Sequence, residues 1–207
     1  MIDIYAFLKT HDISYESFAH PAVFTCEEAE RLCPKMPGVP VKNLFLRSKD
    51  KKRHLLVVVG YDKRVNLNEL KTVLGISGLG FASSERLQKY LGVEPGSVTL
   101  LGLVNDTEHA VEVIFDQGIW GQALQCHPLV NTATLVIPVD GIERLLKATG
   151  HAYQVMEVPE KAVTASTEAF ITPRSFGISQ SVIPIMIEIR KPRCCNVALS
   201  KYSCCFT

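Results

Sequence analysis

The sequence predicts an α/β protein in which helices surround a mixed, largely antiparallel sheet. Two apolar segments, 43–47 and 55–59, flank a charged turn and indicate a hairpin. The second of these, Leu-Leu-Val-Val-Val, is typical of a strand buried on both faces. Helix-capping signals fall between the strand-like segments at irregular intervals rather than after every strand. The pattern therefore argues against a doubly wound parallel sheet, in which strands and helices alternate.

The N-terminal part of the chain contains two predicted helices and one strand. Ile4, Phe7 and Leu8 have the spacing of one helical face. Residues 14–18 indicate a short strand. The stretch 25–28, Thr-Cys-Glu-Glu, is a capping box, with a hydroxyl at the cap and a carboxylate three residues later. A second helix is therefore expected to begin there.

The stretch 36–46 organises the rest of the chain. It contains two prolines and a glycine, which exclude a helix because proline has no amide donor and fixes its own φ. It ends in the apolar segment 44–46, with Lys42 expected at the mouth of this strand. A lysine that a rigid loop holds at the end of a core strand is well placed to meet a ligand. By position alone, the ordinary interpretation is a solvated lysine at a strand end.

Three later helices are predicted from their terminal residues. Asn66 caps the first, Ser84 begins the second and Asp140 caps the third. Each ends at a glycine, the residue that most readily closes a helix: Gly75, Gly92 and Gly150. Five further segments indicate strands, the last of them at an edge: 97–103, 110–115, 124–126, 132–137 and 153–158.

The length of 207 residues is sufficient for a sizeable core. One domain is predicted over residues 1–160, followed by a poorly ordered C-terminal tail over 161–207. No apolar run of about 18 residues occurs and the first residues lack a signal peptide, so a cytoplasmic location and no membrane partner are expected. The net charge of +1 argues against a strong electrostatic attraction to nucleic acid, although it allows local contact.

Cysteines are unevenly distributed. Those in the body are isolated, as is typical of a reduced cytosolic domain, and free thiols are expected in the tail at Cys194, Cys195, Cys204 and Cys205. The terminal Cys-Cys-Phe-Thr has the shape of a prenylation box, although threonine is an unusual last residue, and the neighbouring basic residues suit palmitoylation. An unmodified, ill-ordered tail is the favoured alternative.

The common catalytic motifs are missing. No Cys/His group has metal-ligand spacing, and there is no nucleophile elbow, phosphate-binding loop or dinucleotide fingerprint, so no metal or cofactor is expected. A lone histidine before proline, such as His20, is usually a turn residue. His127 begins the stretch His-Pro-Leu-Val-Asn between two strands, where it and Asn131 can face a pocket. Spacing alone makes neither histidine catalytic.

Five fragments occur in one order along the chain: His-Pro-Ala-Val-Phe-Thr-Cys-Glu-Glu from His20, Lys-Asn-Leu-Phe-Leu from Lys42, Asn-Leu-Asn-Glu-Leu from Asn66, Gly-Ser-Val-Thr from Gly96, and His-Pro-Leu-Val-Asn-Thr-Ala-Thr from His127. Together they resemble the trans-acting prolyl-tRNA editing proteins, which are freestanding relatives of the editing insert of prolyl-tRNA synthetase within the YbaK-type deacylases. The similarity is closest to the subgroup that removes alanine from proline tRNA. It implies an editing-domain fold over nearly the whole body.

The resemblance implies a hydrolase that deacylates mischarged tRNA with water as the attacking group. Lys42 matches the catalytic lysine, which anchors the terminal nucleotide and polarises the ester. The loop Gly96, Ser97, Val98 and Thr99 matches a Gly-x-x-x-Pro loop that forms an oxyanion hole, although Leu100 replaces the usual proline. His127 matches a histidine that lines the aminoacyl pocket. Asn131 and His20 are also expected to bind substrate.

A physical argument agrees with such an activity. Proline and alanine differ by two methylenes, and one methylene in an apolar pocket gives only about 1–3 kcal/mol of discrimination. A second, smaller site that hydrolyses the wrong ester is the remedy. The alternatives are a non-catalytic module that binds a tRNA end or a synthetase, and, within the enzymes, a deacylase for cysteine esters. The expected partner is mischarged tRNA, and prolyl-tRNA synthetase is a further candidate.

Overall fold

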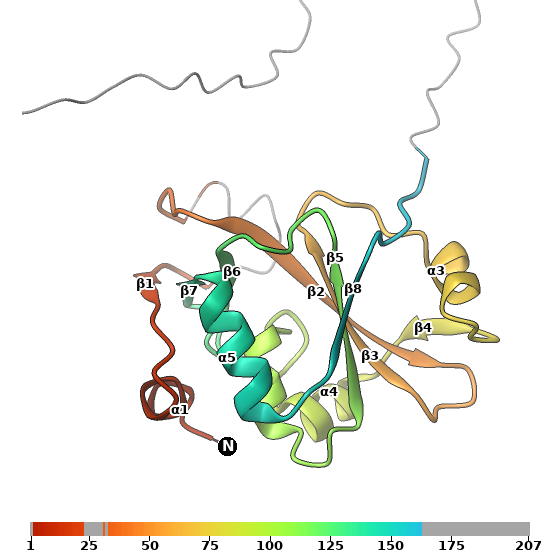
Figure 1. Cartoon of the computed structure of the whole chain (residues 1–207), viewed down its shortest axis with the longest axis horizontal. Helices are drawn as coiled ribbons and strands as arrows, with labels where there is room; N and C mark the ends of the chain where they lie inside the picture. Colours follow the sequence, from red (N-terminus) through yellow and green to blue (C-terminus); the bar gives the residue numbers. More distant parts are fainter. Residues whose placement is uncertain (1, 23–30, 32, 163–207) are drawn as a thin grey trace, which may run out of the picture. The chain divides into compact units, whose positions relative to one another are not determined.

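The structure is a computed structural model that describes residues 2–22, 31 and 33–162 (Figure 1). The helix expected from the capping box at 25–28 lies outside these residues. The tail from residue 163 onward also lies outside the described residues, so the predictions for its four cysteines and for lipidation do too.

One mixed sheet contains every strand of the described residues, in the order β1-β7-β6-β2-β3-β5-β8, with β4 paired to β2. Pairing is antiparallel for β1–β7, β6–β7, β2–β3 and β2–β4, and parallel for β2–β6, β3–β5 and β5–β8. The α/β prediction of a mixed, mostly antiparallel sheet with helices is confirmed. The strands are β1 (Glu16–Ala19), β2 (Val39–Ser48), β3 (His54–Gly60), β4 (Leu79–Phe81), β5 (Val111–Asp116), β6 (Leu124–Cys126), β7 (Ala133–Ile137) and β8 (Tyr153–Met156).

Two apolar clusters lie on opposite faces of the sheet. The main core includes Leu56 and Val58 of β3 and side chains of three helices, α1 (Ile4–Thr10), α4 (Ser84–Leu91) and α5 (Val139–Thr149). The second cluster includes Leu55, Val57 and Val59 with residues of α3 (Leu67–Val73). Side chains alternate between the two faces of a strand, so a strand covered on both faces must be apolar throughout. This explains the continuous apolar run of β3.

The predicted strand over 97–103 is wrong. Residues Leu100–Asn105 form a 3-10 helix, η1, and the Thr99 hydroxyl accepts a hydrogen bond from the Leu101 amide at 3.3 Å. Residues 100–104 are all buried in the interior. A short apolar run fits a buried helix as well as a buried strand, and periodicity cannot separate the two.

Smaller differences concern element ends. The predicted C-terminal glycines are confirmed: Gly92 and Gly150 are left-handed C-caps, and Gly75, also with positive φ, directly follows the C-cap of α3. α5 instead begins at Val139, with Pro138 at the cap position, so Asp140 lies in the first turn and not at the cap. The sequence analysis also missed β4, a three-residue strand with a glycine at its centre.

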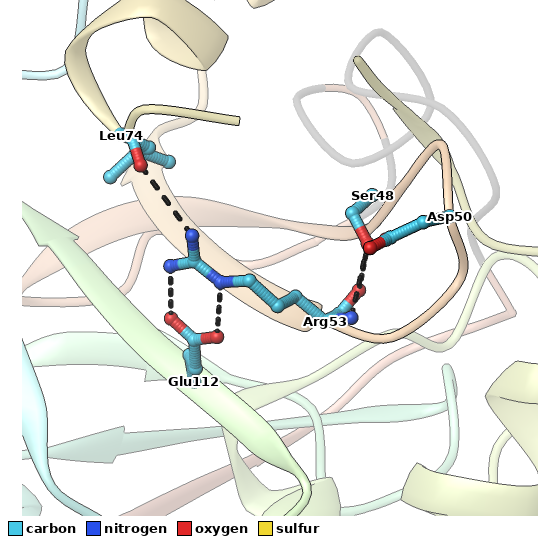
Figure 2. Close-up of polar contacts among 5 residues, drawn as sticks. All are labelled: Ser48, Asp50, Arg53, Leu74 and Glu112. Atoms are coloured by element: carbon cyan, nitrogen blue, oxygen red, sulfur yellow. Dashed lines mark hydrogen bonds and ion pairs between the residues drawn. The ribbon is translucent and has the colours of Figure 1, made fainter. Parts of the chain in front are cut away.

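The charged turn between β2 and β3 is closed by its own side chains (Figure 2). The Ser48 hydroxyl donates to the Asp50 carboxylate and accepts from the Arg53 amide at 3.0 Å. The Arg53 guanidinium donates to both carboxylate oxygens of Glu112, at 2.7 Å each, and to the carbonyl of Leu74 at 3.5 Å. These contacts join the hairpin to β5 and to the end of α3.

We expect residues 1–164, which form one compact unit, to fold without the rest of the chain. The last described residues are bonded to the segment before α3: the amide of Asn66 donates to the carbonyl of Pro159 at 2.8 Å, and that of Lys161 to the carbonyl of Arg64 at 2.7 Å. A chain ending at residue 164 should keep the Tm of the full chain. A chain ending at residue 156 should lose these bonds and melt at a lower temperature. Failure of the longer fragment to fold would contradict the prediction.

Candidate active site

Lys42 lies inside β2, as its fourth residue, and not at the strand mouth that the sequence indicated. β2 begins before Pro40, directly after a glycine at position 38 that has a φ of +77°. The backbone there lies close to the residue before β6, since an added Cβ would be 2.8 Å from the carbonyl oxygen of Ala123. The amide of Val39 donates to the same carbonyl at 2.8 Å. Proline is tolerated next in the strand, since the parallel pairing with β6 ends there.

Strand register brings Lys42 and His127 to the point where β2 and β6 part. The two strands pair only at Val39–Leu124 and Pro40–Gln125. Two residues further along β2 is Lys42, which is instead paired with Val59 of β3. Two residues further along the other chain segment is His127. The two side chains therefore flank the place where the two strands separate.

Lys42 is on the sheet face opposite the main core. Its cross-strand partner Val59 belongs to the cluster on the α3 side, and directly paired residues share a face. The side chain is half-buried, and within the described part of the chain its ammonium group makes no ion pair or hydrogen bond. A half-buried cation without a carboxylate is available to an anionic or carbonyl group of a ligand.

His20 is buried and fully hydrogen-bonded, unlike an ordinary turn residue. Its amide donates to the carbonyl of Thr132 at 3.0 Å, which extends the β1–β7 pairing by one bond. The ring Nδ1 donates to the carbonyl of Pro21 at 2.8 Å, so Nε2 accepts from the Thr134 hydroxyl at 2.9 Å. Thr134 is a site residue that the sequence reasoning missed. The sequence indicates only that Thr134 lies in a strand, whereas the pairing of β1 with β7 brings it beside His20.

His127 lies against His20, with ring centroids 6.0 Å apart and planes at 67°. Its Nδ1 donates to the carbonyl of Ala133 at 3.1 Å, which leaves Nε2 as an acceptor in the neutral ring. Burial lowers the pKa of His127 and the nearby His20 lowers it further, while the Ala133 carbonyl opposes the shift. Leu129 adopts a left-handed φ of +64° in the same loop, and Asn131 is half-buried there. The site thus holds an uncharged imidazole where β2 and β6 part, together with an ammonium that has no partner among the described residues.

The loop expected to form an oxyanion hole is positioned from the main-core side. Gly96 has a φ of +89°, and the amide of Ser97 donates to the carbonyl of Glu94 at 3.0 Å. Val98 packs against the main core, and Thr99 is completely buried. Among the residues described, no hydrogen bond joins this loop to Lys42 or His127. Leu100, in the place of the usual proline, is also fully buried, so core packing holds the end of the loop.

Comparison with known proteins identifies the family. A model of the aminoacyl-tRNA editing domain matches residues 20–145. The chain belongs to the aminoacyl-tRNA editing domain family. It is 37% identical to the prolyl-tRNA editing protein ProX of Acetoanaerobium sticklandii over 147 residues, which cover 70% of this chain and 90% of that protein. It is 38% identical to prolyl-tRNA synthetase associated domain-containing protein 1 of Danio rerio, over 70% of this chain and 80% of that protein.

Solved structures support the editing-domain fold. A candidate trans-editing enzyme for prolyl-tRNA synthetase superimposes with a TM-score of 0.57 at 18% identity, covering 77% of this chain and 96% of that one. A hypothetical protein gives a TM-score of 0.58 at 19% identity, covering 76% and 99%. Such low identities establish the shared fold alone.

The described residues also bear on three other features: metal sites, membrane-spanning helices and reactive thiols. These contain no group of three or more histidine, cysteine or acidic side chains arranged to hold a metal ion. No helix in this part of the chain is long and apolar enough to span a bilayer. Cys126 is fully buried, and burial raises the pKa of its thiol to about 12. At neutral pH this thiol is not a nucleophile in the editing domain.

The lowered pKa of His127 predicts a pH dependence of folding. Between the folded pKa and the unfolded value of about 6.5, the unfolded chain binds more protons, so stability falls as the pH falls through this window. We expect the free energy of unfolding to decrease between pH 7 and pH 5, and His127→Gln to make this decrease shallower. Each unit of pKa shift contributes about 1.4 kcal/mol. Urea denaturation across this range measures the effect. The exposed His11→Gln is the control, and equal slopes for His127→Gln and wild type would contradict the prediction.

Proposed function

We propose that this editing-domain protein is a trans-acting deacylase that hydrolyses the ester of mischarged proline tRNA, with alanine as the amino acid removed. The observation that carries the proposal is the placement, where β2 and β6 part, of a neutral His127 and of Lys42, whose ammonium has no partner among the described residues. The relative ProX, named as a prolyl-tRNA editing protein, is matched over 90% of its length, so the proposed activity needs no further domain.

In the proposed reaction, water attacks the carbonyl carbon of the aminoacyl ester. The bond between that carbon and the ribose oxygen breaks, the ribose oxygen takes up one proton of the water as a hydroxyl, and the amino acid leaves as a carboxylate after its second proton passes to solvent. A ribose hydroxyl of the substrate assists the water. The ester is already activated, so neither a protein nucleophile nor a metal is required for this step.

The side chains have separate roles in this proposal. The ammonium of Lys42 acts as a compact point charge that holds the terminal nucleotide and polarises the ester. Amides of the loop from Gly96 to Thr99 stabilise the negative charge that develops on the carbonyl oxygen. Nε2 of His127 accepts a hydrogen bond from the ammonium of the amino acid. His20 and Asn131 line the same pocket, and the Thr134 hydroxyl fixes the orientation of His20.

Preference for alanine follows from the size of the substrate. A synthetase pocket that admits proline cannot exclude alanine by steric clash, so a smaller second site is needed to correct the error. Cysteine is only slightly larger than alanine and is the competing substrate.

Single-turnover hydrolysis tests the proposal directly. Proline tRNA charged separately with alanine, cysteine, serine or proline is incubated with the protein, and release of the amino acid is followed. We expect alanine to be released fastest and proline to be retained. Faster release of cysteine would reassign the amino acid but keep the activity. If none of the four amino acids were released, the protein would instead be a non-catalytic module that binds a tRNA end or a synthetase. A tRNA-binding measurement would then distinguish these two alternatives.

A further inference from the structure

A second group of polar side chains lies where α4 crosses the end of the β2–β3 hairpin. His54 is 3% exposed, and its ring lies 4.3 Å from that of Tyr90 between centroids. Arg86 of α4 donates from Nη1 to Nε2 of His54 at 2.7 Å. Lys89, one helical turn further on, has its Nζ 5.0 Å from the centre of the Tyr90 ring. Arg47 is paired directly with His54 across the hairpin and completes the group.

We call Arg47, Arg86, Lys89, His54 and Tyr90 the basic-aromatic cluster. Within the described residues, the ion-pair cations are Arg53, Lys63, Arg144 and His151, and none belongs to this cluster. Three cations are therefore gathered around one buried histidine, and none of them forms an ion pair with a carboxylate in the part of the chain that the structure describes. Their proximity has an electrostatic effect, because the pKa of His54 is lowered first by burial and then by Arg86, Lys89 and Arg47.

Such a cluster is costly for the protein alone. The neutral His54 ring accepts from Arg86, a protonated ring would meet three like charges, and the nearby Asp106 only partly offsets their effect on His54. The one carboxylate in the first turn of α4, Glu85, has Ser83 as its main hydrogen-bonding partner and interacts electrostatically with Arg86 alone among the three cations. An anion supplied from outside removes this repulsion.

The positive charge of the cluster, its aromatic ring and its position on β2 together favour a phosphate group of a nucleic acid as the anion. Guanidinium groups bind phosphate through paired donors, and cations beside an aromatic ring are typical of nucleic-acid contacts. The chain as a whole has a net charge of only +1, so attraction to RNA requires a local concentration of cations. Arg47 is five residues from Lys42 on the same strand, so the two side chains lie on opposite faces of the sheet, and their backbones are roughly 16 Å apart, which is short compared with a tRNA.

We propose that the basic-aromatic cluster binds the phosphate backbone of tRNA at a place separate from the aminoacylated end. The proposal rests on the proposed function, since that function makes tRNA the substrate. The cluster supplies affinity without reading the amino acid, and Lys42 and His127 act on the ester.

The test compares two double variants by binding of uncharged proline tRNA to the full-length protein at several salt concentrations. Arg47→Gln/Lys89→Gln removes two cations and leaves the hydrogen bond from Arg86 to His54. Lys9→Gln/Lys147→Gln removes two exposed lysines from α1 and α5 and is the matched control. Each phosphate contact contributes about one unit to the slope of log Kd against log salt. We expect the first variant to lose about two units of slope and the control to lose none.

The outcomes separate this proposal from the proposed function. Equal slopes for wild type and the cluster variant, or equal losses in both variants, would overturn the cluster as a tRNA contact, even if deacylation were intact. Wild-type binding that does not depend on salt would overturn it as well. A specific loss of slope in a protein that hydrolyses no aminoacyl ester would keep the RNA contact and reject the deacylase. Thermal unfolding of each variant verifies that the fold is retained.

Discussion

Replacing Lys42 with alanine should reduce the single-turnover hydrolysis of alanyl-tRNA(Pro) by about 10²–10³-fold, because loss of one well-placed charge contact in a sheltered site has effects of this size. The fold should be retained. The Lys42 side chain is half-buried, and its ammonium group is unpaired within the described part of the chain, so its removal should change the free energy of unfolding by about 0.5 kcal/mol or less.

Lys42→Arg is the more discriminating variant. It keeps the charge, but its broad, planar guanidinium must occupy the place of a compact ammonium beside a small amino acid. We expect arginine to fail as well, with a rate close to that of the alanine variant. Lys9→Ala, an exposed lysine on α1, is the control and should retain the wild-type rate. Wild-type rates from both Lys42 variants would show that Lys42 is a solvated lysine with no part in the reaction.

The largest effect on stability is expected at a buried ion pair beside β5. Lys63 Nζ lies 2.7 Å from a carboxylate oxygen of Asp116, and the two side chains are 18% and 5% exposed. The same oxygen accepts from the amide of Val158 at 3.0 Å. Lys63→Met leaves a buried carboxylate without its cation, which should cost about 3 kcal/mol. Denaturant unfolding measures this loss.

Two further variants separate charge from packing. In Lys63→Met/Asp116→Asn no buried charge remains, and the asparagine oxygen can still accept from the Val158 amide, so part of the lost stability should return. Arg53→Met removes the exposed pair with Glu112, whose side chains are 41% and 44% exposed, and should cost about 1 kcal/mol or less. Similar losses for Lys63→Met and Arg53→Met would mean that burial does not strengthen the inner pair.

Local signals in the sequence predicted most of the elements. The Asn66 cap is an example, since its side chain accepts from the amide of Glu69 as the cap pattern requires. β6 was predicted at its observed bounds, 124–126. The helix η1 was missed because its conformation depends on tertiary contacts: an added Cβ at Gly102 would lie 2.9 Å from the Cβ of Leu91. No local pattern contains that contact.

The candidate site was predicted only as a set of residues. Motifs resembling the editing family named Lys42, His127 and His20, but their arrangement depends on strand order and register. Only the pairing of β1 with β7 and of β6 with β2 brings segments more than 80 residues apart in sequence to one place. The role of Thr134 was missed for the same reason. The roles of Lys42 and of the Gly96 loop stay predictions until the variants are measured.

The two sides of the candidate site should differ in how readily they open. The strand that carries Lys42, β2, is paired with β3 in the middle of the sheet. β3 has a strand on each side and apolar clusters on both faces. We expect amide protons in this region to be among the most slowly exchanging of the described residues. His127 instead begins a loop, after the three-residue strand β6, in which Leu129 holds an unfavourable φ. Under the proposed function, we therefore expect a different amino-acid preference to arise more readily through changes in residues 127–132 than through changes in β2, because this loop can change without disturbing the central sheet.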